Sequence, residues 1–120
     1  MLPQCLLSSL LDRAKIGLNL TLSARNETPD GVDPRFASCL RITEMLDRNI
    51  CVVSEEIPLD NPYADYMVTT PLERLASTCK ELLDSGRWRE AGRSSAAAFR
   101  RKMDVTRVCG PVIERTLRAL

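Results

Sequence analysis

A serine and two carboxylates follow an apolar run in the middle of the chain. Residues 50–53, Ile-Cys-Val-Val, have no polar face and predict a strand that is buried on both sides. Ser54, Glu55 and Glu56 come directly after this run. Ligands of parallel α/β sheets bind beyond the carboxyl ends of the strands, so Ser54 and Glu55 are candidate binding residues. The alternative is a strand-end turn in which Ser54 makes only local hydrogen bonds.

The side chains needed for several common kinds of site are missing from this sequence. It contains no histidine, which excludes a catalytic triad or metal centre that depends on imidazole. Five cysteines are widely spaced and form no CxxC pair. We expect them to be free thiols, mostly buried as small apolar side chains in a reducing cytoplasm. They are Cys5, Cys39, Cys51, Cys79 and Cys109. No metal ion or other cofactor is expected.

Length and composition predict one globular domain over residues 1–120, located in the cytoplasm. Hydrophobic residues make up 44% and charged residues 28%, which are ordinary values for a globular domain. Aromatic residues make up only 4%, too few for the stacking platforms that bind single-stranded nucleic acid. No apolar run is long enough to span a membrane, and the apolar N-terminus lacks the basic segment of a signal peptide.

The charges are distributed unevenly along the chain. Residues 85–120 carry 9 basic and 3 acidic side chains, a net charge of +6, whereas residues 1–84 carry 8 basic and 13 acidic ones. The arginines of the basic part are scattered among alanines at helical spacing. We therefore interpret them as a solvated helix face and expect no nucleic acid as a partner.

The periodicity of apolar residues predicts helices that alternate with strands. Asn49 is expected as a left-handed stop after the second helix, and Ser85-Gly86 as the end of the third. Thr70 and Glu73 have the spacing of a capping box. The predicted elements are helix 2–14, strand 16–22, helix 33–48, strand 50–54, strand 66–69, helix 72–83, helix 88–102 and a last helix capped by Asp104 and bent or broken at Gly110-Pro111.

This order of elements predicts a fold of the α/β class. Strands that alternate with helices form parallel sheets through right-handed crossovers. Three strands make a small sheet, and its apolar strand 50–53 needs helices on both faces. We expect a partial doubly wound, Rossmann-like domain with three layers, a small parallel sheet and a helical C-terminus.

Three segments together resemble a known family of enzymes. They read AKIGLNL, RITEMLDRNICVVSE and YMVTTPLERLASTCKELL. They are similar to the C-terminal part of group 1 glycosyltransferases of the GT-B architecture, and most similar to the spore-maturation type. The resemblance covers about residues 12–100. It implies that the chain is the half that binds the donor, a nucleoside diphosphate sugar, and that it is truncated on its N-terminal side.

The resemblance also implies roles for five residues. Glu44 matches the acidic residue that contacts the nucleotide ribose, and Arg35 would lie near the diphosphate. Arg41 belongs to the same motif as Glu44, and Ser54 and Glu55 would line the floor of the donor pocket. The alternative for Glu44 is an ion pair with a neighbour on its helix, Arg48, and the alternative for Arg35 is a solvated side chain.

This sequence departs from the family where a further acidic residue is usual. Phe36 and Ser38 occupy the corresponding places, and no catalytic residue is assigned. Hexosyl transfer would then require the missing acceptor-binding half, supplied by a complementing chain, and the domain alone is expected to be inactive. The second hypothesis is a non-catalytic interaction module that associates with itself or a partner through its exposed sheet edge.

Overall fold

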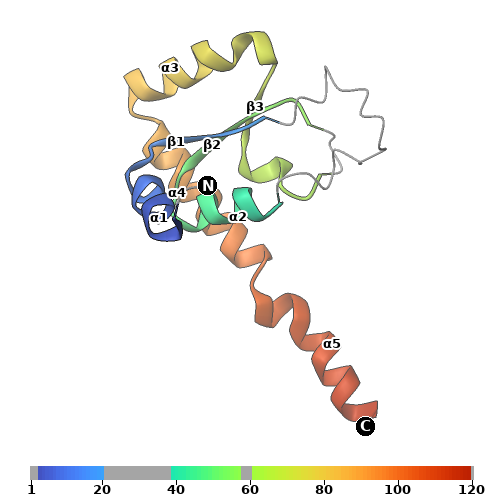
Figure 1. Cartoon of the computed structure of the whole chain (residues 1–120). Helices are drawn as coiled ribbons and strands as arrows, with labels where there is room; N and C mark the ends of the chain where they lie inside the picture. The colour runs from blue at the N-terminus through green and yellow to red at the C-terminus, as the bar shows by residue number, and fades with distance from the viewer. Residues whose placement is uncertain (1–2, 21–38, 58–60, 120) are drawn as a thin grey trace, which may run out of the picture.

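The computed structural model describes residues 3–20, 39–57 and 61–119, and it shows an α/β fold with a small parallel sheet. Figure 1 shows α3 on one side of the sheet and α1 and α2 on the other. The helices are α1 (Gln4–Arg13), α2 (Cys39–Asp47), α3 (Leu75–Ser85), α4 (Trp88–Lys102) and α5 (Val105–Ala119). The strands are β1 (Ile16–Asn19), β2 (Cys51–Glu55) and β3 (Val68–Thr70), and two short 3-10 turns are η2 (Ala64–Tyr66) and η3 (Leu72–Arg74).

All three strands run parallel, in the order β1-β2-β3, as the sequence predicted. The pairing of β1 with β2 places Asn19 opposite Ser54. The pairing of β2 with β3 places Glu55 opposite Thr70. The last residues of the strands are therefore neighbours at one edge of the sheet, which we call the carboxyl edge.

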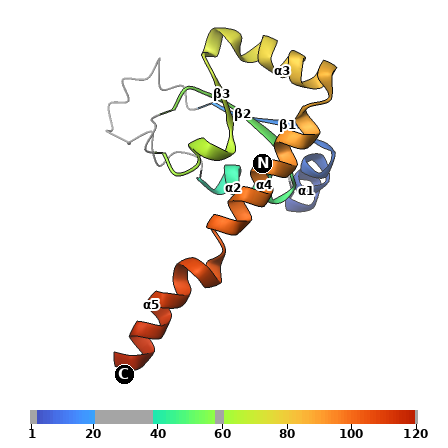
Figure 2. The same cartoon turned by 180° about the vertical axis from the view of Figure 1, so that it is seen from behind.

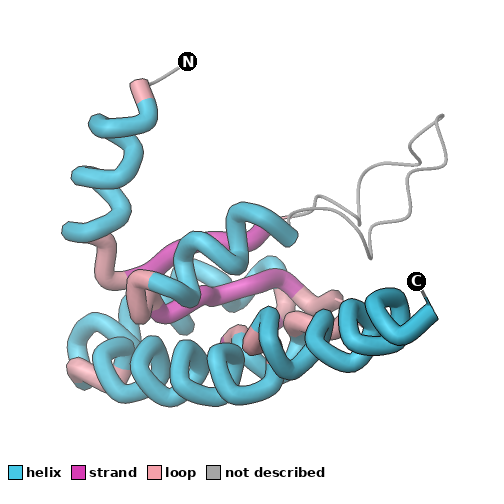
Figure 3. The backbone as a smooth tube through the Cα atoms, turned by 90° about the horizontal axis from the view of Figure 1, so that it is seen from below, coloured by secondary structure: helices cyan, strands magenta, loops and turns pink. Residues whose placement is uncertain are grey.

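The central strand is covered on both faces, because every residue of β2 is buried. On one face Val52 packs with apolar residues of α2, among them Ile42 and Leu46. On the other face Cys51 and Val53 pack with Leu82 of α3. Figure 3 shows the strands lying between two groups of helices. The three-layer prediction is confirmed.

Helix α4 contributes to both layers because it crosses the beginning of β2. Its first half supplies Trp88 and Ala91 to the cluster on the α3 side, and its second half supplies Phe99 to the cluster on the α2 side. Gly92 lies at the crossing point, where an added Cβ atom would be 2.2 Å from the carbonyl oxygen of Asn49. Only glycine allows the helix and the strand backbone to approach so closely.

Several of the predicted helix boundaries are confirmed. Asn49 has φ 57° and Gly86 has φ 72°, so the left-handed positions are the ones that the sequence predicted. Asp104 caps α5, since its Oδ1 accepts hydrogen bonds from the N–H groups of Thr106 at 2.8 Å and Arg107 at 3.2 Å. Helix α4 has the bounds that were expected for it.

The predicted capping box of Thr70 and Glu73 is wrong. Pro71 keeps an extended backbone with ψ 144°, so the helical turn begins only at Leu72. The N-cap position is therefore Pro71, whose side chain cannot cap a helix. The Thr70 hydroxyl instead lies 3.2 Å from that of Thr78 on α3. A 3-10 turn comes first, and α3 itself starts only at Leu75.

Other boundaries also differ from the expectations. Strand β2 continues through Ser54 and Glu55 rather than ending in a turn there. The third strand begins at Val68, because Tyr66 belongs to η2. Helix α5 is not broken at Gly110-Pro111 and continues with Pro111 in its interior. The predicted start of the second helix at residues 33–38 lies outside the described residues.

Helix α5 extends away from the rest of the molecule, as Figures 1 and 2 show from opposite sides. This projection gives the molecule its elongated dimensions of 55 × 37 × 31 Å. Within the described ranges, none of the helices combines the length and the apolarity needed to cross a bilayer.

Candidate functional site at the carboxyl edge

Buried polar side chains gather at the carboxyl edge of the sheet. Asn19 ends β1, Ser54 and Glu55 end β2, and Thr70 ends β3. Together with Asn61, in the connection that follows β2, they make up all the buried polar side chains of the described part of the chain. Burial of a polar group is costly unless it is hydrogen bonded, so such a cluster needs partners.

The orientation of the Asn19 side chain is fixed by Ser54. The Ser54 Oγ lies 2.8 Å from the carbonyl oxygen of Glu55 and 3.2 Å from that of Asn19. Both oxygens are acceptors, so the hydroxyl donates its single proton to a carbonyl. It can then only accept from the Asn19 side chain, and Asn19 Nδ2 donates to it at 3.0 Å.

The remaining atom of this amide, Asn19 Oδ1, is buried and has no hydrogen-bond partner among the described residues. Asn19 as a whole is only 1% exposed to solvent. An unpaired buried acceptor costs about 1–3 kcal/mol relative to a paired one. The carboxyl edge therefore offers an acceptor suited to a hydroxyl or N–H donor.

Glu44 takes part in a different cluster, between α1 and α2. Its carboxylate pairs with Arg48 at 3.4 Å, which was the alternative that the sequence left open. Arg48 also pairs with Asp12 at 3.2 Å and donates to the Ser8 hydroxyl at 3.4 Å, so it joins the two helices. Glu44 is thus held in place by its neighbour, and its contact with a ribose stays a prediction.

The other predicted site residues have different surroundings. The structure brings Ser54 and Glu55 together with Asn19 at the carboxyl edge. Arg41 is exposed on α2. Arg35 lies outside the described residues. Ser54 does more than form a local strand-end turn, because its side-chain partner Asn19 is 35 residues away in the chain.

Sequence reasoning missed Asn19 and Thr70 as members of this cluster. Asn19 was assigned to the polar face of an alternating strand, and Thr70 to a helix cap. The signal that could have placed them was the register, because parallel pairing of two short strands sets Asn19 opposite Ser54. Asn61 acts as a turn residue in the connection after β2, since its Oδ1 accepts a hydrogen bond from the Tyr63 N–H at 2.9 Å.

The cysteines with a described side chain differ in burial, and the buried one is not an activated nucleophile. Cys5, Cys51, Cys79 and Cys109 are free thiols, as expected, and Cys39 has no described side chain. The expected burial is right for Cys51 and wrong for Cys5 and Cys109, which are exposed. Burial raises the thiol pKa of Cys51, and the neighbouring Cys79 raises it further. A raised pKa disfavours the reactive thiolate.

No group of three or more metal-binding side chains occurs in the part of the chain that is described. Comparisons of the chain with protein-family models, with curated proteins and with solved structures find no match in any of the three. The resemblance to glycosyltransferases therefore rests on the sequence segments alone.

Proposed function

We propose that this domain binds a nucleoside diphosphate sugar at the carboxyl edge and serves as the donor-binding part of a sugar transferase. The observation that supports the proposal is the cluster of buried polar side chains at the ends of the parallel strands, with Asn19 Oδ1 unpaired among the described residues. In open α/β sheets this edge is where ligands bind.

The chemistry of the cluster suits the hydroxyl-bearing part of such a ligand. Asn19 Oδ1 is an acceptor, and a sugar or ribose hydroxyl is a donor that could pair with it. A carboxylate such as Glu44 can accept two hydrogen bonds from a ribose diol. The diphosphate needs positive charge, which Arg35 and Arg41 would supply under this proposal.

The proposed reaction requires no cofactor. The bond between the anomeric carbon and the diphosphate oxygen breaks, and the acceptor hydroxyl forms the new bond to that carbon and loses its proton. Negative charge develops on the diphosphate that leaves, so cationic side chains and N–H groups near it would lower the barrier. The residue that takes the acceptor's proton is not assigned.

Calorimetric titration with uridine, guanosine and adenosine diphosphates tests the proposal. We expect one of them to bind, and Glu44→Gln to weaken that binding roughly ten- to a hundredfold, because charged hydrogen bonds contribute about 1.5–3 kcal/mol. Thermal melting of the same variant should change little, since a partly exposed helical ion pair contributes at most about 0.5 kcal/mol. Glu81→Gln on α3 is the matched control and should leave binding unchanged.

Two results would overturn different parts of the proposal, the first the role of Glu44 and the second the function of the domain. Unchanged affinity of Glu44→Gln in a protein that binds nucleotide would remove Glu44 from the site but keep the domain's function. A wild-type protein that binds none of the nucleotides would favour an interaction module. One observation supports that second candidate: β1 is an edge strand of the sheet, and its Leu18 is 44% exposed.

A further inference from the structure

Helix α5 presents an apolar face that no described element covers. Figures 1 and 2 show the helix projecting from the end of α4, away from the sheet and the other helices. Four large aliphatic side chains on it are more than half exposed. They are Val108 at 53%, Val112 at 57%, Ile113 at 55% and Leu117 at 65%. At about 100° per residue, positions 108, 112, 113 and 117 fall within one half of the helix circumference, which we call its apolar face.

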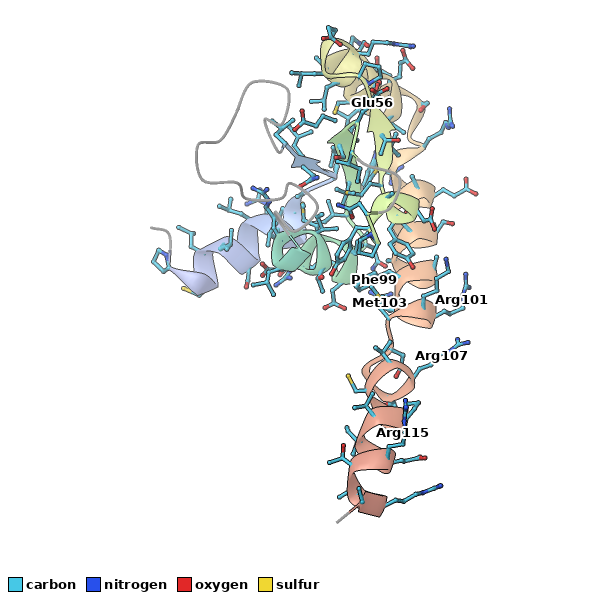
Figure 4. All side chains as sticks on the ribbon, turned by 90° about the vertical axis from the view of Figure 1, so that its right-hand side faces the viewer. Glu56, Phe99, Arg101, Met103, Arg107 and Arg115 are labelled. Atoms are coloured by element: carbon cyan, nitrogen blue, oxygen red, sulfur yellow. The ribbon has the colours of Figure 1, made fainter. Side chains whose placement is uncertain are left out.

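The opposite face of α5 is basic. Arg107 and Arg118, with Glu114 between them, are spaced by seven and four residues and lie on one side, and Arg115 flanks them. Basic side chains continue into the end of α4. Arg107 Nη1 donates to the carbonyl oxygen of Arg101 at 3.2 Å, which brings these two arginines close together. Figure 4 shows Arg101 and Arg107 projecting to the same side of the molecule.

A helix of this composition needs a surface to hold it. Isolated helices of about 15 residues are marginal in water even when they are rich in alanine. α5 has Pro111 in its interior, which removes one backbone hydrogen bond, and several of its residues are β-branched. Its stability must therefore come from burial of the apolar face.

The charge of this region indicates which kind of surface fits. Residues 100–120 carry six basic and two acidic side chains, a net charge of +4. A second copy of the chain fits poorly, because four partly exposed side chains cover far less than the roughly 800 Å² per partner of a stable dimer. Two copies of this basic helix would also repel each other. A surface that is negatively charged outside and apolar just beneath would complement both faces, because the charge attracts the arginines and the apolar layer takes up the aliphatic side chains.

We propose that α5 docks on an anionic lipid surface, with its apolar face in the boundary between headgroups and acyl chains. A helix with one apolar face and one face rich in arginine lies in the plane of that boundary. The arginines attract anionic headgroups, and each basic residue near the surface strengthens binding about fivefold. The body of the domain would remain in water, attached through the end of α4. This inference is independent of the proposed sugar-nucleotide site.

Co-sedimentation with vesicles tests the docking. The probes are vesicles of phosphatidylcholine alone and vesicles with roughly one-third phosphatidylglycerol, each at low and at raised salt. We expect the full chain to bind only the anionic vesicles, and raised salt to weaken the binding. Leu117→Ser should reduce affinity about tenfold, because it removes a buried leucine. The control Leu40→Ser changes a leucine that is 88% exposed on α2 and should have no effect.

A second pair of variants tests the charge. Arg115→Gln combined with Arg118→Gln should weaken binding to anionic vesicles roughly thirtyfold. The control pair, Arg74→Gln at the end of η3 combined with Lys80→Gln on α3, should not weaken it. Absence of binding to anionic vesicles, or equal binding to both kinds, would overturn the proposal. A lipid-free oligomer that Leu117→Ser dissociates would also overturn it, in favour of a second copy. Because α5 has no extensive contact with the described body, folding of the variants is checked by an unchanged melting transition.

Discussion

Substitution of Gly92 by alanine should destabilise the fold, because the backbones of α4 and β2 are almost in contact there. The added Cβ atom would lie 2.2 Å from the Asn49 carbonyl oxygen and 3.0 Å from the Cys51 nitrogen. Neither backbone atom can move freely. Asn49 is already in a left-handed conformation, and the Cys51 N–H donates to the Lys15 carbonyl oxygen at 3.3 Å. Relief of the contact therefore requires both an outward shift of the helix and a displacement of the Cys51 N–H from the Lys15 carbonyl oxygen.

The size of the effect follows from three contributions. Overpacking of a well-packed site costs about 1–3 kcal/mol. Loss of the hydrogen bond between Cys51 and Lys15 adds about 1 kcal/mol. The better helix propensity of alanine returns about 1 kcal/mol. We expect a net loss of about 2 kcal/mol in the free energy of unfolding, which corresponds to a Tm lower by roughly 8 °C in a domain of this size.

Urea unfolding and thermal melting of the wild type and the variant measure this loss. Gly110→Ala is the matched control, because it is also a helical glycine but has no atom within 4 Å of the added Cβ. It should change the free energy of unfolding by at most about 1 kcal/mol in either direction, because alanine favours a helix whereas Pro111 disfavours a side chain directly before it. A Gly92→Ala protein that melts at or above the wild-type temperature would refute the close crossing of α4 over β2.

Two further predictions concern the Ser54 hydroxyl at the carboxyl edge and the thiols of the described cysteines. Ser54→Ala should lower the free energy of unfolding by about 1–3 kcal/mol, because it leaves Asn19 Nδ2 buried without its acceptor. Denaturant unfolding measures this loss, with Ser94→Ala as the exposed control. Equal stability of the two variants would contradict the Asn19–Ser54 pair. Alkylation of the native protein, followed by peptide mass spectrometry, should modify the exposed Cys5 and Cys109 first. Cys51 should react more slowly, because burial shields its thiol and raises its pKa, and modification of Cys51 as fast as Cys109 would count against its burial.

Local patterns in the sequence determined the elements and several of their ends. The apolar run 50–53 predicted a strand covered on both faces, because every residue in it is apolar. This prediction is confirmed, since all residues of β2 are buried. The left-handed positions at Asn49 and Gly86 followed from the residue types that accept positive φ. Alternation of helices and strands predicted the parallel sheet. These features depend on neighbouring residues, so a single sequence contains enough information to predict them.

The candidate site was predicted only in part. Ser54 and Glu55 could be placed at the end of a strand because the apolar run before them defines that strand. Asn19 could not be joined to them, since the pairing depends on the register of two strands 35 residues apart in the chain. The same reason explains the capping box: a cap at Thr70 looked favourable locally, but Thr70 pairs with Glu55 of β2 as the last residue of β3, and Pro71 stays extended before the helical turn.

Only the tertiary structure decided which distant segments are in contact and which surfaces remain exposed. The sequence showed Gly92 only as a residue within a helix. Its position at the crossing of α4 and β2 depends on how α4 packs against the sheet. The exposed apolar face of α5 likewise depends on the direction in which the helix leaves the body. Backbone conformation is governed by residues within a few positions, whereas packing is governed by residues that meet only after the chain has folded.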